Sequence, residues 1–290
     1  MLPLESVPNF SEGRDTATID AIGAALDAHA RLLDVHADPD HNRSVFTVVG
    51  DEESLVEALV SAVETARSRI DLRRHEGAHP RIGAADVVPI VPVAAGDLER
   101  ARATALLVGE RLGALDLPVF VYAPPERGPA FYRRGGTDEL QRRLDAGELV
   151  PDFGPPRLDP AAGGVIVGAR RPLIAFNVNL RGSVEAAREI AAAVREHDGG
   201  GFPGVRALGI DLPRAGFVQV SMNVEDWEAA ALHEIVARVE AEAVARGAGV
   251  LGSELVGLLP AGAALAAAGA ALRIDGFDAS RVLELRLLDS

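Results

Sequence analysis

The sequence predicts an α+β fold built from two ferredoxin-like subdomains, each with the element order β-α-β-β-α-β and related by duplication. The first observation is that apolar residues switch between a period of two and a period of 3.6 in the same succession in both halves of the chain. The second is that 290 residues, 48% of them hydrophobic, suffice for two cores. We expect the subdomains at residues 1–180 and 181–290. The repeat is one of topology, because the halves show no convincing residue-level identity.

The first half supplies one β-α-β-β-α-β unit and some additional elements. We expect strands at residues 4–8, 31–36, 44–50 and 86–93, and helices at residues 15–28 and 51–70. The strand at 86–93 contains two prolines, so we expect it at a sheet edge or irregularly paired. The additional elements are a helix at 98–112, a strand at 119–122, a short charged helix within 136–147 and a loop at 151–164.

The second half repeats the order. We expect strands at 173–179, 205–212, 217–222 and 250–255, and helices at 183–195 and 225–246. Ser183 is a suitable N-cap for the first of these helices. The uncharged run at 255–272 is long enough to consider as a membrane span, but it is mostly Ala and Gly and contains Pro260. We expect a strand end followed by a buried, alanine-rich helix.

Composition restricts the function. The net charge of −14 argues against nucleic acid and anionic membranes as partners, because both repel an acidic protein. The absence of cysteine excludes disulfides, thiolate metal sites and a cysteine nucleophile. The N-terminus does not resemble a signal peptide. We expect a cytoplasmic protein whose anionic ligands meet a local positive patch.

Residues 75–79 spell H-E-x-x-H, the helix motif of zinc peptidases, in which two histidines hold the metal and the glutamate is the general base. The motif requires a helix, and Gly77 within it and Pro80 directly after it both disfavour one. We therefore expect no metal. In a plainer alternative, His75 and His79 are ordinary polar loop residues.

Positive and imidazole side chains gather in the same part of the chain. They are His36, His41, His75, His79, Arg43, Arg73, Arg74 and Arg81. In a β-α-β-β-α-β unit, the loop after strand two and the loop after helix two can both reach one end of the sheet. Arginine forks bind carboxylates, and a near-neutral histidine serves as general acid and base, so this pattern favours a dicarboxylate site. For any single arginine, the alternative is a surface ion pair.

Several segments, taken together, are far more specific than the zinc motif. In chain order they read V-P-N-F-S-E-G at 7–13, H-N-R-S-V at 41–45, R-H-E-G-A-H-P-R-I-G-A at 74–84, P-D-F-G-P at 151–155, G-A-R at 168–170, L-I-A-F-N-V-N-L at 173–180 and G-S-E-L-V-G-L-L-P at 252–260. With these segments the chain resembles the glutamate formimidoyltransferases, which include the formiminotransferase part of formiminotransferase-cyclodeaminase.

The resemblance implies transfer of a formimino group from N-formimino-L-glutamate (formiminoglutamate) to N5 of tetrahydrofolate, a co-substrate, in histidine degradation. It implies two ferredoxin-like subdomains with the active site between them, a homodimer and no metal. The family's catalytic histidine falls on His79, and His41, Arg43 and Arg81 are the expected donor-binding residues. The family's folate-binding segment falls on Gly163, Gly164, Val165, Ile166, Val167, Gly168, Ala169, Arg170, Arg171 and Pro172.

Two departures and three alternatives accompany this interpretation. His36 stands where the bifunctional enzymes carry an acidic residue, and the segment at 164–167 is more apolar than theirs. A related folate-dependent transfer of a formyl group from N-formyl-L-glutamate is the first alternative, since the two donors differ at one heavy atom. A non-catalytic folate-binding protein is the second, and a zinc hydrolase is the third.

Overall fold

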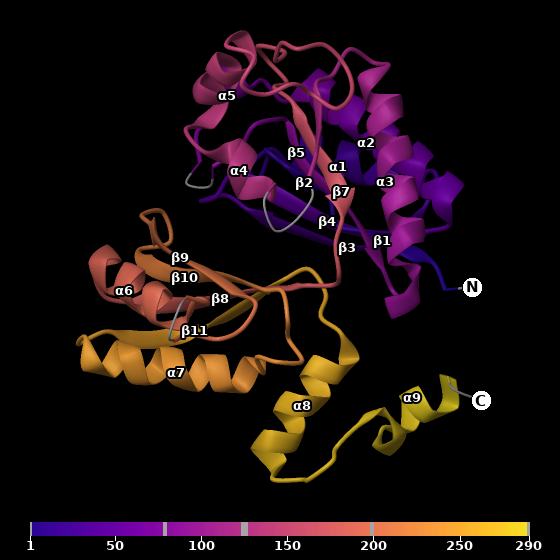
Figure 1. Cartoon of the computed structure of the whole chain (residues 1–290). Helices are drawn as coiled ribbons and strands as arrows, with labels where there is room; N and C mark the ends of the chain where they lie inside the picture. The colour runs from indigo at the N-terminus through magenta and orange to yellow at the C-terminus, as the bar shows by residue number, and fades with distance from the viewer. Residues whose placement is uncertain (1, 78–79, 123–126, 198–199, 289–290) are drawn as a thin grey trace. The chain divides into compact units, whose positions relative to one another are not determined.

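A computed structural model of the chain describes residues 2–77, 80–122, 127–197 and 200–288. The chain forms two compact units, residues 1–171 and 172–290 (Figure 1). We expected the boundary at 180/181. The division falls earlier because the strand Ile174–Arg181 (β8) pairs with two strands of the C-terminal unit and with none of the N-terminal one.

The N-terminal unit contains the expected ferredoxin-like core. Its elements are β1 (Leu4–Ser6), β2 (Asn9–Phe10), α1 (Thr16–Asp27), β3 (Arg31–Asp38), β4 (Arg43–Gly50), α2 (Glu52–Arg69) and β5 (Ala85–Pro92). β1 and β2 are two pieces of one first strand, and both pair with β4 and β5. Strand β3 pairs with the outer side of β4. This arrangement confirms the α+β prediction.

The expected edge position of the proline-containing strand is wrong, although its pairing is irregular. β5 lies inside the sheet, between β1/β2 and β7 (Val165–Ala169), and all eight of its residues are buried. The break between β1 and β2 falls opposite Pro89, whose carbonyl accepts a 2.7 Å hydrogen bond from Ser6 Oγ. The chain tolerates this proline inside the sheet because the neighbouring strand is interrupted where regular pairing would fail.

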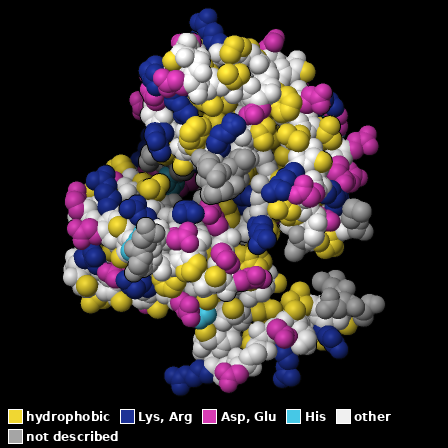
Figure 2. Space-filling model, in the orientation of Figure 1, with side chains coloured by type: hydrophobic (Ala, Val, Ile, Leu, Met, Phe, Trp, Pro, Cys, Tyr) yellow, Lys and Arg dark blue, Asp and Glu magenta, His cyan; other side chains and the backbone are white. Residues whose placement is uncertain are grey.

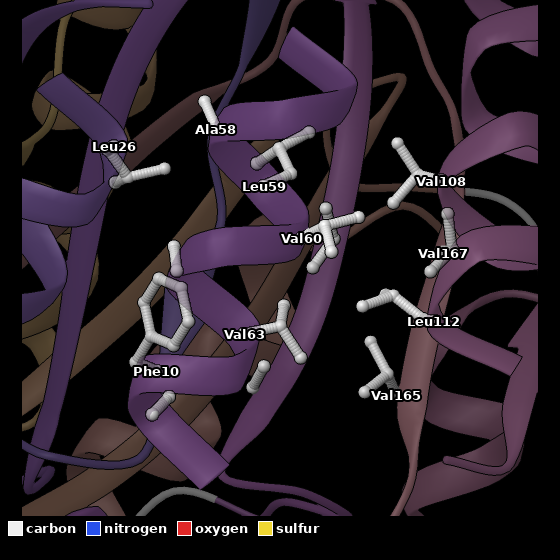
Figure 3. Close-up of a cluster of buried hydrophobic side chains, with 14 of the residues drawn as sticks. Phe10, Leu26, Ala58, Leu59, Val60, Val63, Val108, Leu112, Val165 and Val167 are labelled. Carbon is white, nitrogen blue, oxygen red and sulfur yellow. The ribbon is translucent and has the colours of Figure 1, made fainter. Parts of the chain in front are cut away.

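Further elements widen this sheet and cover both of its faces. They are η1 (Leu72–Arg74), η2 (Ala95–Asp97), α3 (Leu98–Gly113), β6 (Val119–Val121), α4 (Pro129–Arg133), α5 (Gly136–Asp145) and β7. β7 runs parallel to both β5 and β6 and lies between them. Helices α1, α2 and α3 share one core with the sheet, including Phe10, Leu59, Val63 and Val167 (Figure 3). Helices α4 and α5 pack through Tyr132, Leu140 and Leu144 against Ile166 on the opposite face.

The C-terminal unit is a four-stranded antiparallel sheet in the order β11-β8-β10-β9. Its elements are β8, α6 (Val184–Val194), β9 (Val205–Leu212), β10 (Phe217–Val224), α7 (Leu232–Ala245) and β11 (Gly249–Val256), followed by α8 (Ala261–Leu272), η3 (Ala279–Arg281) and α9 (Leu283–Leu288). Helices α6 and α7 share one core with the sheet. Ser183 caps α6 by accepting the Ala186 N–H, as predicted.

The alanine-rich helix α8 is not the buried helix that we expected. Ala263 and Gly269 are its only buried residues, and Leu272 is 65% exposed. Small alanine side chains offer little apolar area, so burying this helix would gain little free energy. Among the described residues, no helix is both long and apolar enough to span a membrane.

Candidate active site

Three segments meet at one end of the N-terminal sheet, and Asn42 joins them. Its side-chain Oδ1 accepts the Gly13 N–H at 2.9 Å, and its Nδ2 donates to the Glu76 carbonyl at 2.9 Å. Asn42 has a φ of 47°, in the left-handed region that asparagine tolerates better than most residues. A Cβ on Gly77 would lie 2.3 Å from the His41 carbonyl oxygen. The prediction that the loops after strand two and helix two reach one end of the sheet is confirmed.

The H-E-x-x-H segment is not helical where the structure describes it. Helix α2 ends at Arg69, a single 3-10 turn follows, and His75 is extended with φ −85° and ψ 129°. His75 and Glu76 therefore lack the helix on which a zinc peptidase depends. His79, the predicted catalytic residue, lies outside the described residues.

A cluster of arginines surrounds a buried carboxylate beside these loops. Asp86, at the start of β5, is 2% exposed. Its Oδ1 accepts the Ile82 N–H at 2.9 Å, and its Oδ2 accepts a hydrogen bond from Arg133 Nη2 at 2.5 Å. Arg43 Nη2 lies 3.8 Å from the same Oδ2. Arg43 also donates from Nε and Nη2 to Asn9 Oδ1, at 2.9 and 2.6 Å.

Arg81 completes the cluster. It donates to the carbonyls of His41 and Asn42, at 3.2 and 3.4 Å, and contacts the His75 ring. A narrow recess is lined by Ser11, Arg43, Arg81 and Asp86. The structure thus brings the predicted residues Arg43 and Arg81 together at one recess.

The electrostatics of this recess favour an anion. Burial lowers the pKa of Arg43 to about 9, with help from Arg133 and Arg81 and against the attraction of Asp86. Burial also lowers the pKa of Arg81 to about 10. Burial and the charges of neighbouring arginines thus both disfavour the charged forms of Arg43 and Arg81. A bound carboxylate would relieve this repulsion and could accept paired hydrogen bonds from a guanidinium.

The other predicted histidines have different surroundings. His41 is 8% exposed, and its ring contacts the carboxylate of Asp38, which holds it in place. Burial lowers the pKa of His75, and the charge of Arg81 lowers it further, so this ring is neutral at pH 7. His36 lies on β3 opposite Val45 of β4.

The predicted folate-binding segment is mostly a core strand. Residues 163–168 are buried, and only 169–172 are partly or fully exposed. Val165 and Val167 point into the core shared with the helices, and Gly168 lies against the Tyr122 ring, which a Cβ would approach to 2.7 Å. Side-chain contact of this segment with a ligand is therefore possible chiefly at its C-terminal end.

Sequence reasoning missed Ser11, which lines the recess, and four further residues that build it. Asp86 opens an apolar strand, and a charge in that position could have signalled a buried partner. Asn9 and Asn42 lie within segments that carried the family resemblance. Arg133 follows from no local pattern, because α4 brings it to Asp86 across 47 residues of chain. The wider surface gives no comparable signal, since arginine and acidic side chains are interspersed over the face shown in Figure 2.

Comparison with known proteins agrees with this arrangement. Residues 3–170 match the formiminotransferase domain, N-terminal subdomain, and residues 175–276 match the formiminotransferase domain. The chain is 38% identical to a glutamate formimidoyltransferase of Streptococcus pyogenes, over 98% of both chains. It is 37% identical to one of Thermoplasma acidophilum, over 98% of this chain and 97% of that one.

The bifunctional relatives match over only part of their length. The chain is 41% identical to a formimidoyltransferase-cyclodeaminase of Rattus norvegicus, over 91% of this chain and 51% of that protein. The match to the two relatives named glutamate formimidoyltransferase thus covers nearly the whole of both chains. Because both subdomains match and the identity extends over nearly the whole chain, this protein belongs to the formiminotransferase family.

Proposed function

We propose that this protein is a transferase that moves the formimino group of N-formimino-L-glutamate to N5 of tetrahydrofolate, giving 5-formiminotetrahydrofolate and L-glutamate. The observation that carries the proposal is the end-to-end match, at 38% identity, with a relative named glutamate formimidoyltransferase. The arginine recess supports it independently, since the donor carries two carboxylates and the guanidinium groups of Arg43 and Arg81 line the recess. The reaction belongs to histidine degradation.

The proposed chemistry needs a proton carrier and accurate positioning. N5 of tetrahydrofolate attacks the amidine carbon of the donor and forms a tetrahedral intermediate. His79 accepts the N5 proton and then donates it to the departing glutamate nitrogen, so that its protonation is restored in each cycle. Arg43 and Arg81 hold the donor's carboxylates. His41, whose carbonyl accepts a hydrogen bond from Arg81, belongs to the same donor-binding group. Holding the two substrates together supplies part of the acceleration.

The described neighbours of His79 suit this role. Arg81 is two residues away and is fixed by two loop carbonyls, and Gly77 on the other side packs against His41. These described neighbours support the assignment of His79 as the proton carrier. Homodimer formation and a cytoplasmic location are part of the proposal and are testable by sedimentation and by fractionation.

A parallel donor assay tests the proposal. Purified protein is given tetrahydrofolate with either N-formimino-L-glutamate or N-formyl-L-glutamate, and glutamate release and the folate product are measured by mass spectrometry. We expect turnover with the formimino donor that depends on tetrahydrofolate. Turnover with the formyl donor alone would replace the proposed activity by formyl transfer. Folate binding without turnover of either donor would favour a non-catalytic folate-binding protein.

A further inference from the structure

Two segments that carried the family resemblance lie in the C-terminal unit, where the proposed chemistry does not use them. Residues 173–180 form most of β8 and residues 252–260 begin within β11, and these strands are neighbours. Asn177 is opposite Glu254 in one pairing and opposite Ser221 of β10 in the other. The structure therefore joins two distant segments into one surface.

Their polar side chains share one face of the sheet. Val178, Leu180, Val218 and Val220 point into the core with α6 and α7. Because side chains alternate along a strand, the intervening residues of β8 and β10 point away from those helices. This face carries a polar network, which we define as Asn177, Asn179, Gln219 and Glu254.

Gln219 is the centre of the polar network. It is 1% exposed, and its Nε2 donates to Asn179 Oδ1 at 2.9 Å and to Glu254 Oε2 at 3.2 Å. Asn177 Nδ2 donates to the same Glu254 oxygen at 3.2 Å. These two acceptors fix the orientation of the Gln219 amide, so its Oε1 points elsewhere. Among the described residues, this buried oxygen has no hydrogen-bond partner. Buried carbonyl oxygens are normally satisfied, so Gln219 Oε1 is a candidate acceptor for a donor group of a ligand.

The N-terminal unit contains the same connections at matching strands. There, Arg43 of the third strand of the β-α-β-β-α-β unit donates to Asn9 of the first strand and lies beside Asp86 of the fourth. In the C-terminal unit, Gln219 of the third strand donates to Asn179 of the first and to Glu254 of the fourth. The duplicated fold thus repeats an asparagine, a central donor and a carboxylate on the first, third and fourth strands of each β-α-β-β-α-β unit.

The two versions differ in charge, and the difference indicates different ligands. The arginine of the N-terminal version adds a positive charge and suits an anion. The central residue of the C-terminal version is a neutral amide, which adds the carbonyl oxygen of Gln219 as an acceptor. Acceptors of this kind suit a ligand rich in N–H groups.

We propose that the polar network of Asn177, Asn179, Gln219 and Glu254 binds the pterin ring of tetrahydrofolate, accepting hydrogen bonds from its amino group and ring N–H groups. This inference rests on the proposed function, because that function supplies the pterin. It assigns the C-terminal sheet a binding role for the acceptor substrate, apart from the segment at 163–172.

Calorimetric binding of two probes tests the inference. The probes are tetrahydrofolate and p-aminobenzoyl-L-glutamate, which lacks the pterin. Glu254→Gln keeps the side chain's size and removes its charge, and it should weaken tetrahydrofolate binding about ten- to a hundredfold, as expected for lost charge-assisted hydrogen bonds. Binding of p-aminobenzoyl-L-glutamate and the KM for N-formimino-L-glutamate should not change. Glu240→Gln, on the exposed side of α7, is the matched control and should bind both probes like the parent.

A measurement on the parent protein covers the case in which Glu254→Gln fails to fold. The Gln219 side-chain amide resonance, assigned with Gln219→Met, should shift on adding tetrahydrofolate and stay in place with p-aminobenzoyl-L-glutamate. Suppose that the parent protein transfers the formimino group. If Glu254→Gln then changes the tetrahydrofolate affinity by less than twofold, or if the Gln219 resonance does not shift, this inference alone is overturned. A parent that binds no tetrahydrofolate overturns the proposed function as well.

Discussion

Replacing Asp86 by asparagine removes a carboxylate that is buried beside the guanidinium groups of Arg43 and Arg133. The side chain of Asp86 is 2% exposed, and those of Arg43 and Arg133 are 16% and 14% exposed, so solvent compensates little of the lost charge. Asparagine can still accept the Ile82 N–H, which preserves the local turn. Breaking a buried ion pair by removing one partner costs about 3–5 kcal/mol, and we expect about 3 kcal/mol here.

Urea unfolding measures this cost, and the chain offers a convenient separation of signals. Both tyrosines, Tyr122 and Tyr132, lie in the N-terminal unit, and the single tryptophan, Trp227, lies in the C-terminal unit. With a slope of about 2 kcal/mol per molar urea, the tyrosine-reported midpoint should fall by about 1.5 M. Adding sulfate should stabilise Asp86→Asn more than the parent, because an anion can replace the missing charge.

Glu57→Gln is the matched control. It removes a 2.9 Å ion pair with Arg111 whose side chains are 43% and 51% exposed, so it should cost less than about 1 kcal/mol. Asp86→Asn could contradict this reasoning in two ways: by lowering the free energy of unfolding no more than this surface control, or by being stabilised by sulfate no more than the parent. Either result would show that the recess does not favour an anion. The assignment of donor carboxylates to it would then lose its electrostatic basis.

Three further substitutions test the loop and the proposed chemistry. His79→Ala should lower turnover by about two to four orders of magnitude while leaving the thermal midpoint within a few degrees, and near-full activity would remove this residue from the mechanism. Gly77→Ala places a Cβ 2.3 Å from the His41 carbonyl oxygen, so it should displace the loop and lower kcat/KM, whereas Gly96→Ala, with nothing within 4 Å, should have no effect. Burial lowers the pKa of His75, so below pH 6.5 the unfolded chain binds a proton that the folded one does not. Stability should therefore be complete above pH 6.5 and decline below it, and His75→Gln should show a smaller decline; equal pH profiles would contradict the shift.

Local periodicity was sufficient to predict most of the fold, because each ferredoxin-like unit is encoded by short amphipathic segments. The helix expected at 51–70 is observed as α2, Glu52–Arg69, and the strand expected at 205–212 is β9. The central position of β5 was not predictable in the same way. The central position of β5 depends on its pairing with β7, and 72 residues separate the two strands in the sequence. The β7 segment is a short apolar run between glycines, a pattern that fits many positions in a sheet.

The candidate site was predictable only where its residues share a sequence segment. Arg81 belongs to the loop that carries His75, and Arg43 follows directly after His41 and Asn42, so proximity in sequence indicated a common site. Asp86 was assigned to the strand but not to the site. Its partner Arg133 arrives on a helix that the sequence did not predict, and tertiary packing alone brings the two together.

The duplication explains how one topology could provide for two chemically different substrates. In both units the first, third and fourth strands of the β-α-β-β-α-β unit are neighbours in the sheet and contribute polar side chains to one cluster. The third strand supplies Arg43 in one unit and Gln219 in the other, and this difference in charge accords with our proposal that the first cluster binds an anion and the second binds N–H donors. A change of charge at the third strand can therefore provide a second ligand preference without a new pocket. We expect that the two units contribute unequally to binding of the two substrates.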